Sequence, residues 1–381
     1  MSSRPPDLRP AGGTNGFALP LVLMVLTILM VAATASYLLA RLDRQSGQNV
    51  LQALRASEAA EAGIAELVVG WNPGTYDTMT PGSTMALAGR ALSRGSAYAA
   101  RLTRLGGRLF LARSDGMDST PNGAVGRRTL GPLLRVVVPD PAITGALVAL
   151  DSVVTDSLWV AGDDTIPPAW AGRCLGGDSA IAGLRVLPAT PVLVRSCPSG
   201  TCLTGNPGLA RDSTIGPALL TTIGPLTFAE LAAQARYTVG SSLVGLRPFV
   251  TGSPPACDGN QPLNWGEPWG GTPFQACSGY FPIVFAPGDL VVTGGRGQGL
   301  LLVAGNLTLE AGMEFYGMII AQGQLAAGSG GAHIIGGVRV GGVKPGVGAL
   351  RIQSSACVVR AALAGASLPL PLAQRSWIQV Y

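Results

Sequence analysis

The sequence predicts an α+β protein in which one long N-terminal helix is followed by a β-rich chain. Three observations support this fold class. The run from Phe17 to Ala40 contains no charged residue. A proline-free stretch of strong helix formers then continues to Val69. Further along, apolar segments separated by glycines recur over residues 288–343, which is typical of short stacked β-strands.

Residues 17–70 are predicted to form a single transmembrane and packing helix behind a polar leader, residues 1–16. A bilayer core needs roughly 20 apolar residues, and the uncharged run exceeds this length. Apolar residues then recur at three- and four-residue spacing until glycine and proline end the helix after Gly70. At 1.5 Å per residue the helix is roughly 80 Å long. A secretory signal peptide has a shorter apolar run, whereas a plain membrane anchor fits the same length.

Two short motifs flank the membrane-spanning length of this helix. Gly16 and Phe17 stand where the leader meets the apolar run, and residues 53–63 have the sequence Ala-Leu-Arg-Ala-Ser-Glu-Ala-Ala-Glu-Ala-Gly. Over about the first 70 residues this arrangement resembles the PilX-type minor pilins, members of the type IV pilin-like superfamily. The resemblance implies that a prepilin peptidase cuts between Gly16 and Phe17, and that the new N-terminal Phe17 is methylated.

The same resemblance implies a location and a set of partners. A PilX-like chain is expected in the bacterial inner membrane as a single-pass protein, with its N-terminus in the cytoplasm and its head outside, or at the cell surface in a pilus. Its expected partners are the membrane, other pilin-like subunits, the pilus assembly machinery and the prepilin peptidase. The expected role is non-enzymatic, in assembly, priming or adhesive display at a filament tip.

The chain departs from the major pilins at the fifth residue after the expected cut. Major pilins carry glutamate there, and its carboxylate neutralises the terminal ammonium of a neighbouring subunit, whereas this chain has Leu21. An unpaired charge in lipid is costly, so the departure favours a minor subunit over a repeating filament body. The alternative is a monomeric membrane-anchored envelope protein whose β-rich head binds a glycan or a partner protein.

All six cysteines follow residue 170, on the side of the helix that we expect outside the cytoplasm. An even number in such a compartment favours disulfides, and six cysteines allow fifteen pairings. Cys197 and Cys202 close most easily, because four turn-forming residues separate them. One histidine and no Cys-x-x-Cys pair argue against zinc, so we expect no metal and no cofactor. The candidate disulfide cysteines are Cys174, Cys197, Cys202, Cys257, Cys277 and Cys357.

Residues 71–140 are predicted to form an antiparallel β-meander of the kind found in pilin-like heads. Strands are expected over 96–105, 108–113 and 127–138. A two-glycine turn separates the first two strands, and a loop made of Asp115-Gly116 and Pro121-Asn-Gly123 precedes the third.

Nine arginines are concentrated in this region, at positions 90, 94, 101, 104, 108, 113, 127, 128 and 135. Only Asp115 and Asp118 oppose them between residues 90 and 135. A basic stripe attracts phosphate, acidic glycans or lipid headgroups. The same arginines also suit the solvated face of β-hairpins, so nucleic acid and acidic glycan are only secondary candidates as partners.

Residues 141–287 are rich in glycine, proline, serine and threonine and contain five of the six cysteines. They are predicted to be a disulfide-braced β and loop region with one helix near 227–237, which opens with a capping box. Trp265 and Trp269 lie in a loop of this region. Exposed, they would stack on sugars; buried, they would hold a disulfide-rich loop together.

The segment 288–343 contains a repeat in which glycine, a polar residue and leucine recur at spacings of 17 and 18. The repeats begin at Gly288, Gly305 and Gly323, and each carries two short apolar strands. This pattern predicts a small parallel β-helix whose turns bury their apolar side chains against one another. The unit resembles bactofilin-like β-solenoids and the C-terminal regions of some PilX-like proteins. The tail, residues 344–381, is expected to pack back on the last repeat as its cap.

Residues for catalysis are scarce, so we expect no enzymatic activity. The only lysine, Lys344, precedes a proline and cannot complete a P-loop, and the only histidine, His333, cannot form a zinc-protease motif. The repeats offer three carboxylates, on Asp289, Glu310 and Glu314. A glycan-cleaving enzyme is the remaining alternative, and it requires Glu310 and Glu314 to approach each other across a turn.

Overall fold

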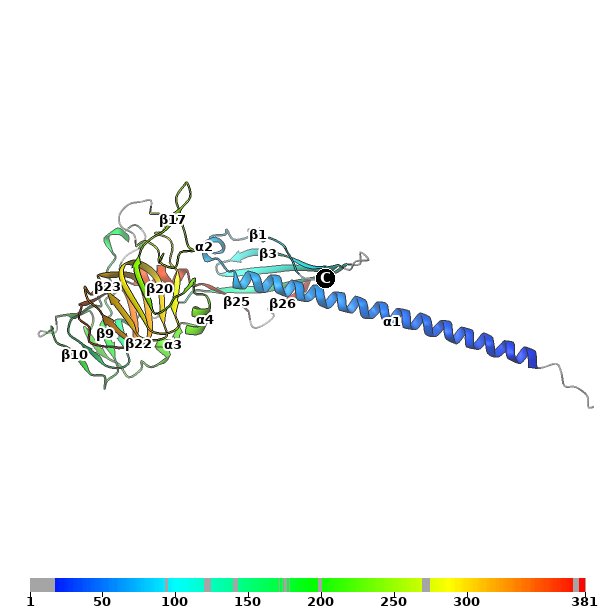
Figure 1. Cartoon of the computed structure of the whole chain (residues 1–381), viewed down its shortest axis with the longest axis horizontal. Coiled ribbons are helices and arrows are strands. Elements are labelled where there is room, and N and C mark those ends of the chain that lie inside the picture. Colours follow the sequence, from blue (N-terminus) through cyan, green and yellow to red (C-terminus); the bar gives the residue numbers. More distant parts are fainter. Residues whose placement is uncertain are drawn as a thin grey trace, which may run out of the picture.

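The computed structural model is an elongated molecule in which one long helix leads past an antiparallel sheet to a body of parallel strands (Figure 1). It describes residues 18–92, 95–119, 125–139, 143–170, 172, 174, 177, 179–197, 201–268, 275–372 and 377–380. The predicted α+β class is confirmed, since a long apolar helix accompanies both parallel and antiparallel sheets.

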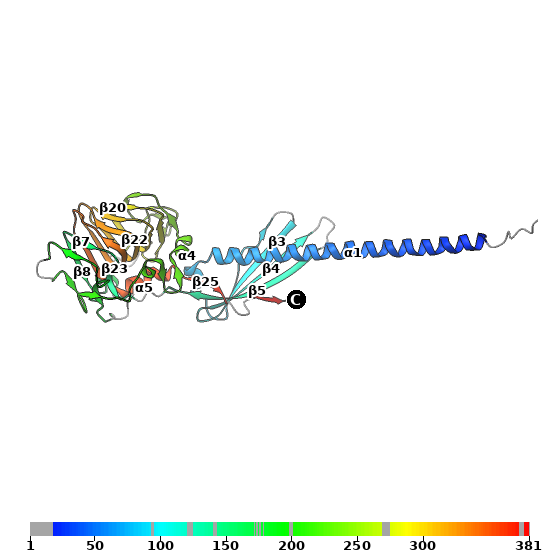
Figure 2. The same cartoon turned by 90° about the horizontal axis from the view of Figure 1, so that it is seen from below.

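Helix α1 (Ala18–Val69) is 52 residues long. It ends as the sequence predicts, with the N–H of Gly70 donating to the carbonyl of Glu66, and the short helix α2 (Pro73–Tyr76) follows. The first part of α1 projects away from the rest of the molecule, and the second part lies along the antiparallel sheet (Figure 2).

The antiparallel sheet is the predicted meander with short additions at one edge. Its central strands are β3 (Ser96–Gly106), β4 (Leu109–Ser119) and β5 (Val125–Val137), and β1 (Thr84–Ala86) and β2 (Arg90–Ala91) pair with β3. Alternate side chains of the central strands face α1. They form one apolar core with it, which includes Ile64, Leu67, Leu102, Phe110 and Leu134.

The predicted loop is wrong at Asp115 and Gly116, because β4 continues without interruption to Ser119, and its second part, residues 121–123, lies outside the described residues. Gly116 is a strand residue at the closest approach of α1. A Cβ there would overlap the carbonyl oxygen of Ala56 and lie 2.5 Å from the backbone nitrogen of Ala60. This glycine therefore serves a helix–sheet contact, which the local sequence does not distinguish from a turn.

The predicted capping of the parallel strands by the tail is wrong for its last residues. Helix α5 (Ala356–Ala364) packs on the parallel body, but β25 (Leu368–Pro371) and β26 (Trp377–Val380) return to the antiparallel sheet and pair with β5. An unpaired strand edge presents free N–H and C=O groups, and the tail satisfies those of β5. The chain consequently connects the sheet and the parallel body twice.

Three long strands form the centre of the parallel body: β20 (Leu290–Val303), β22 (Met313–Ala327) and β23 (Ala332–Val343). Equivalent positions of the sequence repeat lie side by side, as where Leu301 pairs with Ile319. Side chains on one side of these strands are buried in a single core that spans the whole parallel body.

The long strands bend at glycines that stack in a column. Gly299, Gly317 and Gly336 all have positive φ, at 118°, 150° and 141°, a conformation that favours glycine. A Cβ on Gly317 or Gly336 would overlap the carbonyl oxygen of the preceding glycine in the column. Only glycine therefore allows β20, β22 and β23 to bend at positions that pair with one another in the sheet.

Parallel pairing extends well beyond residues 288–343. β6 (Gly145–Ala149) pairs with β23, and β9 (Ala182–Val186) and β12 (Leu209–Arg211) continue the sheet outward. Most of the strands in the region 141–287 thus belong to the same sheet. The segments that connect its strands differ in length, so no fixed spacing in the sequence reveals them.

The remaining elements are short. The other strands of the parallel sheet are β7 (Val153–Thr155), β8 (Leu158–Ala161), β10 (Val192–Val194), β11 (Leu203–Thr204), β15 (Tyr237–Thr238), β16 (Ser242–Leu246), β19 (Ile283–Ala286), β21 (Leu307–Glu310) and β24 (Leu350–Ser354). Two separate antiparallel pairs join β13 (Thr222–Ile223) to β14 (Leu226–Thr227) and β17 (Val250–Thr251) to β18 (Ala256–Cys257). The short helices are η2 (Pro168–Trp170), α3 (Ala218–Thr221) and α4 (Phe228–Ala233).

The helix predicted near 227–237 is α4, and it ends earlier than expected. Both hydrogen bonds of its capping box are present between Thr227 and Glu230, as the sequence predicts. Tyr237 belongs instead to β15, which pairs with β19. With α5, α4 covers apolar side chains on the outer side of the long strands, such as Met318.

The polar residue of each repeat forms a ladder along one corner of the parallel body. The carboxylate of Asp289 accepts hydrogen bonds from the backbone N–H of Asn306 at 2.7 Å and from its side-chain amide at 3.1 Å. The side-chain oxygen of Asn306 in turn accepts from the N–H of Gln324 at 2.9 Å. The backbone N–H of Asn306, followed by its side chain, lowers the pKa of Asp289 below the usual value.

This ladder predicts a contribution of Asp289 to stability that depends on pH. A lowered folded-state pKa stabilises the native state above the unfolded value of about 3.9, and this stabilisation is lost as the pH falls through the folded pKa. Asp289→Asn keeps an acceptor oxygen but does not titrate. We expect the stability of the variant to depend less on pH below about 4 than the stability of the wild type does. Acid unfolding monitored by circular dichroism measures this difference. Asp163→Asn, at an exposed position, is the control, and an equal effect of both substitutions would contradict the prediction.

Candidate membrane and assembly helix

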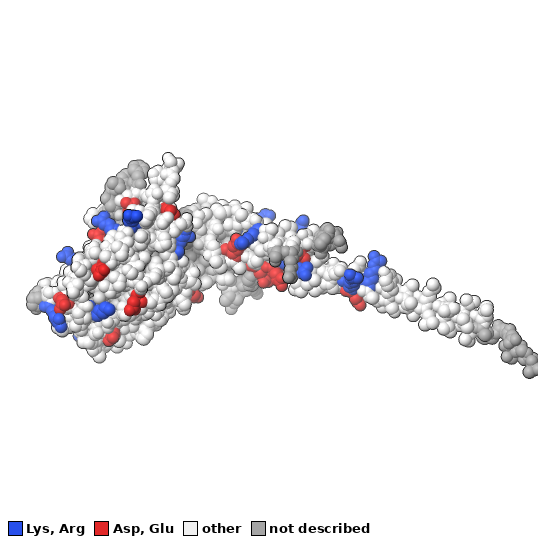
Figure 3. Space-filling view, viewed as in Figure 1, with Lys and Arg blue, Asp and Glu red and all other residues white. Residues whose placement is uncertain are grey.

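The first part of α1 is an apolar rod that no described residue covers. Leu19, Leu29 and Val31 are 74%, 59% and 67% exposed. By length and composition this helix can cross a membrane. The face visible in Figure 3 carries no charge along this part of the helix. In the sequence, the first charged residues after it are Arg41, Asp43 and Arg44.

Beyond these charges, a strip of exposed residues continues along the side of α1 that faces away from the sheet. We call it the outer strip: Val50, Leu51, Leu54, Glu58 and Glu61. Its members recur at three- and four-residue spacing, which places them on one helix face. The three apolar members are 57%, 47% and 58% exposed, and both glutamates are exposed and have no ion pair among the described residues.

The opposite side of the same helix segment is made of small residues that press on the sheet. Ala56 and Ala60 are completely buried. A Cβ on Gly63 would come within 2.6 Å of the ring of Tyr98, and Gly116 makes the matching close approach from β4. The alanines and the glycine of the motif over residues 53–63 therefore have a physical role, because they let the helix and sheet backbones approach closely.

Two polar clusters fix this contact at its ends. The hydroxyl of Tyr98 and the guanidinium of Arg90 both donate to Glu66, and these two hydrogen bonds, that of Tyr98 first, lower the pKa of the Glu66 carboxyl. At the other end, the buried carboxylate of Asp118 accepts from the hydroxyl of Ser96 at 2.7 Å and lies 4.0 Å from Arg55. These partners lie far apart in the sequence, and sequence analysis did not pair them.

The structure divides the nine arginines between several environments. Arg104 donates to the carbonyl oxygens of Asp77 and Gly107, so it holds loops together. Four others lie on the sheet face turned away from α1, and we call them the arginine face: Arg101, Arg113, Arg127 and Arg135. Arg94 lies outside the described residues.

The arginine face carries little opposing charge. Asp115 lies between two of its members, 3.3 Å from Arg113 and 3.8 Å from Arg101. Arg127 and Arg135 are exposed and have no ion pair among the described residues. Half-buried apolar side chains, including Leu111 and Leu133, lie between the arginines.

The two residues of the expected processing site, Gly16 and Phe17, lie outside the described residues. Leu21, at the position where major pilins have glutamate, is 55% exposed on the first turns of α1. Among the described residues of α1, none before Arg41 carries a charge.

The six candidate cysteines form three disulfides in the parallel body: Cys174–Cys357, Cys197–Cys202 and Cys257–Cys277. The short-range bond predicted between Cys197 and Cys202 is present. Cys174 and Cys357 join segments that are 183 residues apart, a pairing that spacing alone does not predict.

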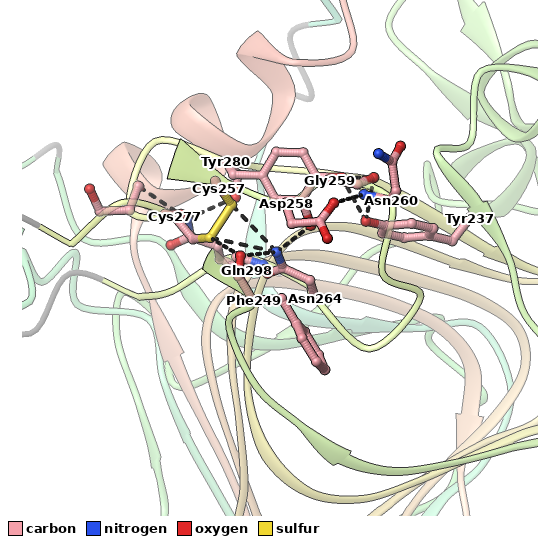
Figure 4. Close-up of a disulfide and its surroundings, with 12 residues drawn as sticks. Tyr237, Phe249, Cys257, Asp258, Gly259, Asn260, Asn264, Cys277, Tyr280 and Gln298 are labelled. Carbon is pink, nitrogen blue, oxygen red and sulfur yellow. Dashed lines mark hydrogen bonds between the residues drawn. A yellow bond between two sulfur atoms is a disulfide. The ribbon is translucent and has the colours of Figure 1, made fainter. Parts of the chain in front are cut away.

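The Cys257–Cys277 disulfide joins β18 to the segment before β19, next to Gln298 of β20 (Figure 4). Beside it, the side-chain amide of Asn264 donates to the carbonyl of Asp258 at 2.8 Å, and that of the buried Gln298 donates to the carbonyl of Tyr280 at 2.9 Å.

Trp265 is completely buried in the core of the parallel body, edge-on to Phe315 at 6.4 Å between ring centroids. Of the two tryptophan interpretations, Trp265 thus fits the structural one. Trp269 lies outside the described residues.

The two carboxylates that glycan cleavage would require, those of Glu310 and Glu314, each interact with a neighbouring side chain. Glu310 accepts from the hydroxyl of Thr293 at 2.7 Å, and Glu314 pairs with Arg296 at 2.7 Å. His333 lies next to Glu314 in the parallel register, and burial lowers its pKa. Within the described part of the chain, no group of three or more His, Cys, Asp or Glu side chains is arranged to hold a metal ion.

Comparison with known proteins finds no protein family, no curated protein and no solved structure that matches this chain.

Proposed function

We propose that this protein is a non-enzymatic, pilin-like subunit of the PilX type, anchored in the bacterial inner membrane and acting in type IV pilus or pseudopilus assembly. The observation that carries the proposal is the division of α1 into an uncovered apolar half and a half held on the sheet by small residues. A helix of this kind both inserts in lipid and presents a side to other subunits.

The outer strip supports assembly rather than simple anchoring. An anchor needs only the lipid-crossing segment, yet Leu51 and Leu54 are exposed on the helix segment above it. Apolar residues exposed in a row mark interaction surfaces. In the proposed function they pack against other pilin-like subunits during priming, or at a filament tip.

The head is proposed to lie outside the cytoplasm. Three disulfides support this placement, because disulfides persist in oxidising compartments and are rare in the cytosol. We further infer that the parallel body is a β-solenoid, since its strands pair in register over several turns and bend at stacked glycines. A rigid solenoid suits display or adhesion at the far end of the molecule from the membrane helix.

Processing at the N-terminus tests the proposal. We expect the protein purified from its native membrane to begin at Phe17, with or without a methyl group, as measured by intact mass and N-terminal sequencing. Gly16→Val should leave the leader in place, because the peptidase of a PilX-like chain cuts after this glycine, whereas Gly13→Val should not.

A wild-type chain that retains its leader would contradict a prepilin origin. It would favour the alternative, a monomeric envelope protein whose head binds a glycan or a partner protein.

A further inference from the structure

We propose that neighbouring copies of this chain pack side by side in the membrane, with the outer strip of α1 on one copy against the arginine face of the next. The inference rests on the membrane anchoring in the proposed function. It adds to that function a specific partner, a second copy of this chain, and a specific pair of surfaces.

The two surfaces lie on opposite sides of the same two-layer unit. Residues two positions apart on an α-helix point about 200° apart, so Glu58 and Glu61 face away from the sheet contacted by Ala60 and Gly63. The arginines lie on the far side of that sheet, because Arg113 alternates along β4 with residues that face α1. A copy that uses one surface leaves the other free for the next copy, so the contact is head-to-tail and propagates as a row.

Contacts inside one copy fix the level of the first charge pair along the helix axis. A Cβ on Gly63 of α1 would overlap the hydroxyl oxygen of Ser114 in β4. Arg113, the neighbour of Ser114, therefore stands level with the helical turn that contains Glu61.

The second charge pair follows in the same way. A Cβ on Gly116 would meet Ala56 and Ala60, and these two residues flank Glu58 along the helix. Arg127 lies on β5 opposite the residue next to Gly116, and a Cβ on its neighbour Gly126 would lie 2.9 Å from the carbonyl oxygen of Gln52, so Arg127 stands between the levels of Gln52 and Glu58. Copies anchored in the same membrane stand at equal height. Arg113 and Arg127, about 13 Å apart along the sheet, then lie on either side of the two glutamates, which are about 4.5 Å apart along the helix, and each arginine extends toward the nearer glutamate.

Charge and apolar surface are complementary across this contact. The glutamates of the outer strip have no ion pair among the described residues, and neither has Arg127. Leu54 on the strip would lie near Met117 and Val125 on the arginine face, since both flank the level of Gly126 and Gln52, and Val125 is 49% exposed. Single surface ion pairs contribute little, so the association depends on several pairs together, on these apolar side chains and on the confinement of both copies to one membrane.

Cross-linking between two tagged copies tests the contact. One copy carries Glu61→Cys and the other Arg113→Cys, and a short bis-maleimide is added to membranes in which both full-length chains are expressed. The described native cysteines are all in disulfides, so the new thiols are the ones available to react. We expect a dimer between the two tags. Arg351→Cys, at an exposed position on the parallel body, replaces Arg113→Cys as the control and should give little product.

A charge exchange makes the test specific. Adding Glu58→Arg to the first copy should reduce the cross-linked dimer about fivefold, and adding Arg127→Glu to the second copy should restore it. A yield equal to the Arg351→Cys control, no response to the exchange, or cross-linking only to a different protein would overturn the proposal. Phe17 as the first residue of the same preparation would show that the proposed function stands even if the contact does not.

Discussion

Gly116→Ala is expected to separate the second half of α1 from the antiparallel sheet. The added Cβ would overlap the carbonyl oxygen of Ala56 and lie 2.5 Å from the backbone nitrogen of Ala60. Both are backbone atoms of a regular helix and cannot move aside as a flexible side chain can. Overpacking of a well-packed contact costs about 1–3 kcal/mol, and we expect a loss near 3 kcal/mol because neither backbone can yield.

Hydrogen exchange gives a local measurement of this loss. The amides of residues 56–67 should exchange faster in the Gly116→Ala variant, with the full chain in detergent micelles, while those of the parallel body keep their wild-type rates. Gly106→Ala is the matched control on the same sheet, since a Cβ there meets no atom within 4 Å. Equal protection of residues 56–67 in the two variants would show that the helix and sheet are not in the close contact described.

The elements that could be predicted from the sequence are those specified by local patterns. The length and end of α1 follow from an uncharged run, a helical period and a terminal glycine. The capping box of Thr227 and Glu230 is a contact between residues three positions apart. The repeats at Gly288, Gly305 and Gly323 correspond to strands that pair in register, because each repeat contributes the same short pattern to its neighbours.

The features that sequence analysis missed depend on contacts between distant segments. Gly116 was assigned to a loop, because the close approach of α1 that requires it lies more than fifty residues away. The return of β25 to the sheet depends on the free edge of β5. Likewise, the charge of Arg113 and Arg127 was noted, but only the sheet register places both on the face opposite α1.

Removal of the Cys174–Cys357 disulfide is expected to cost the parallel body far more stability than removal of Cys197–Cys202. The first bond closes a separation of 183 residues and the second a separation of 5. Loop-closure entropy alone then gives losses of about 5 and about 2 kcal/mol.

The surroundings of the Cys174–Cys357 bond also favour a large loss of stability on its removal. Cys174 is nearly buried and belongs to an apolar cluster with Trp170, Ile335 and Val358. Trp170 also stacks on Tyr316 at 6.3 Å between ring centroids. The disulfide therefore joins the segment before β9 to α5 across the long strands. Without it, both the segment before β9 and α5 would pack less firmly on these strands.

Urea unfolding of the full chain in detergent distinguishes the two bonds. We expect the double variant Cys174→Ala and Cys357→Ala to unfold at much lower urea than the wild type, and the double variant Cys197→Ala and Cys202→Ala to unfold only slightly earlier. Each pair removes one disulfide and leaves no unpaired thiol, so the comparison isolates loop length and burial. Similar urea midpoints for the two variants would contradict this prediction. They would mean that the parallel strands hold the segments around residues 174 and 357 together without the bond, and that the disulfide adds little to the stability of the fold.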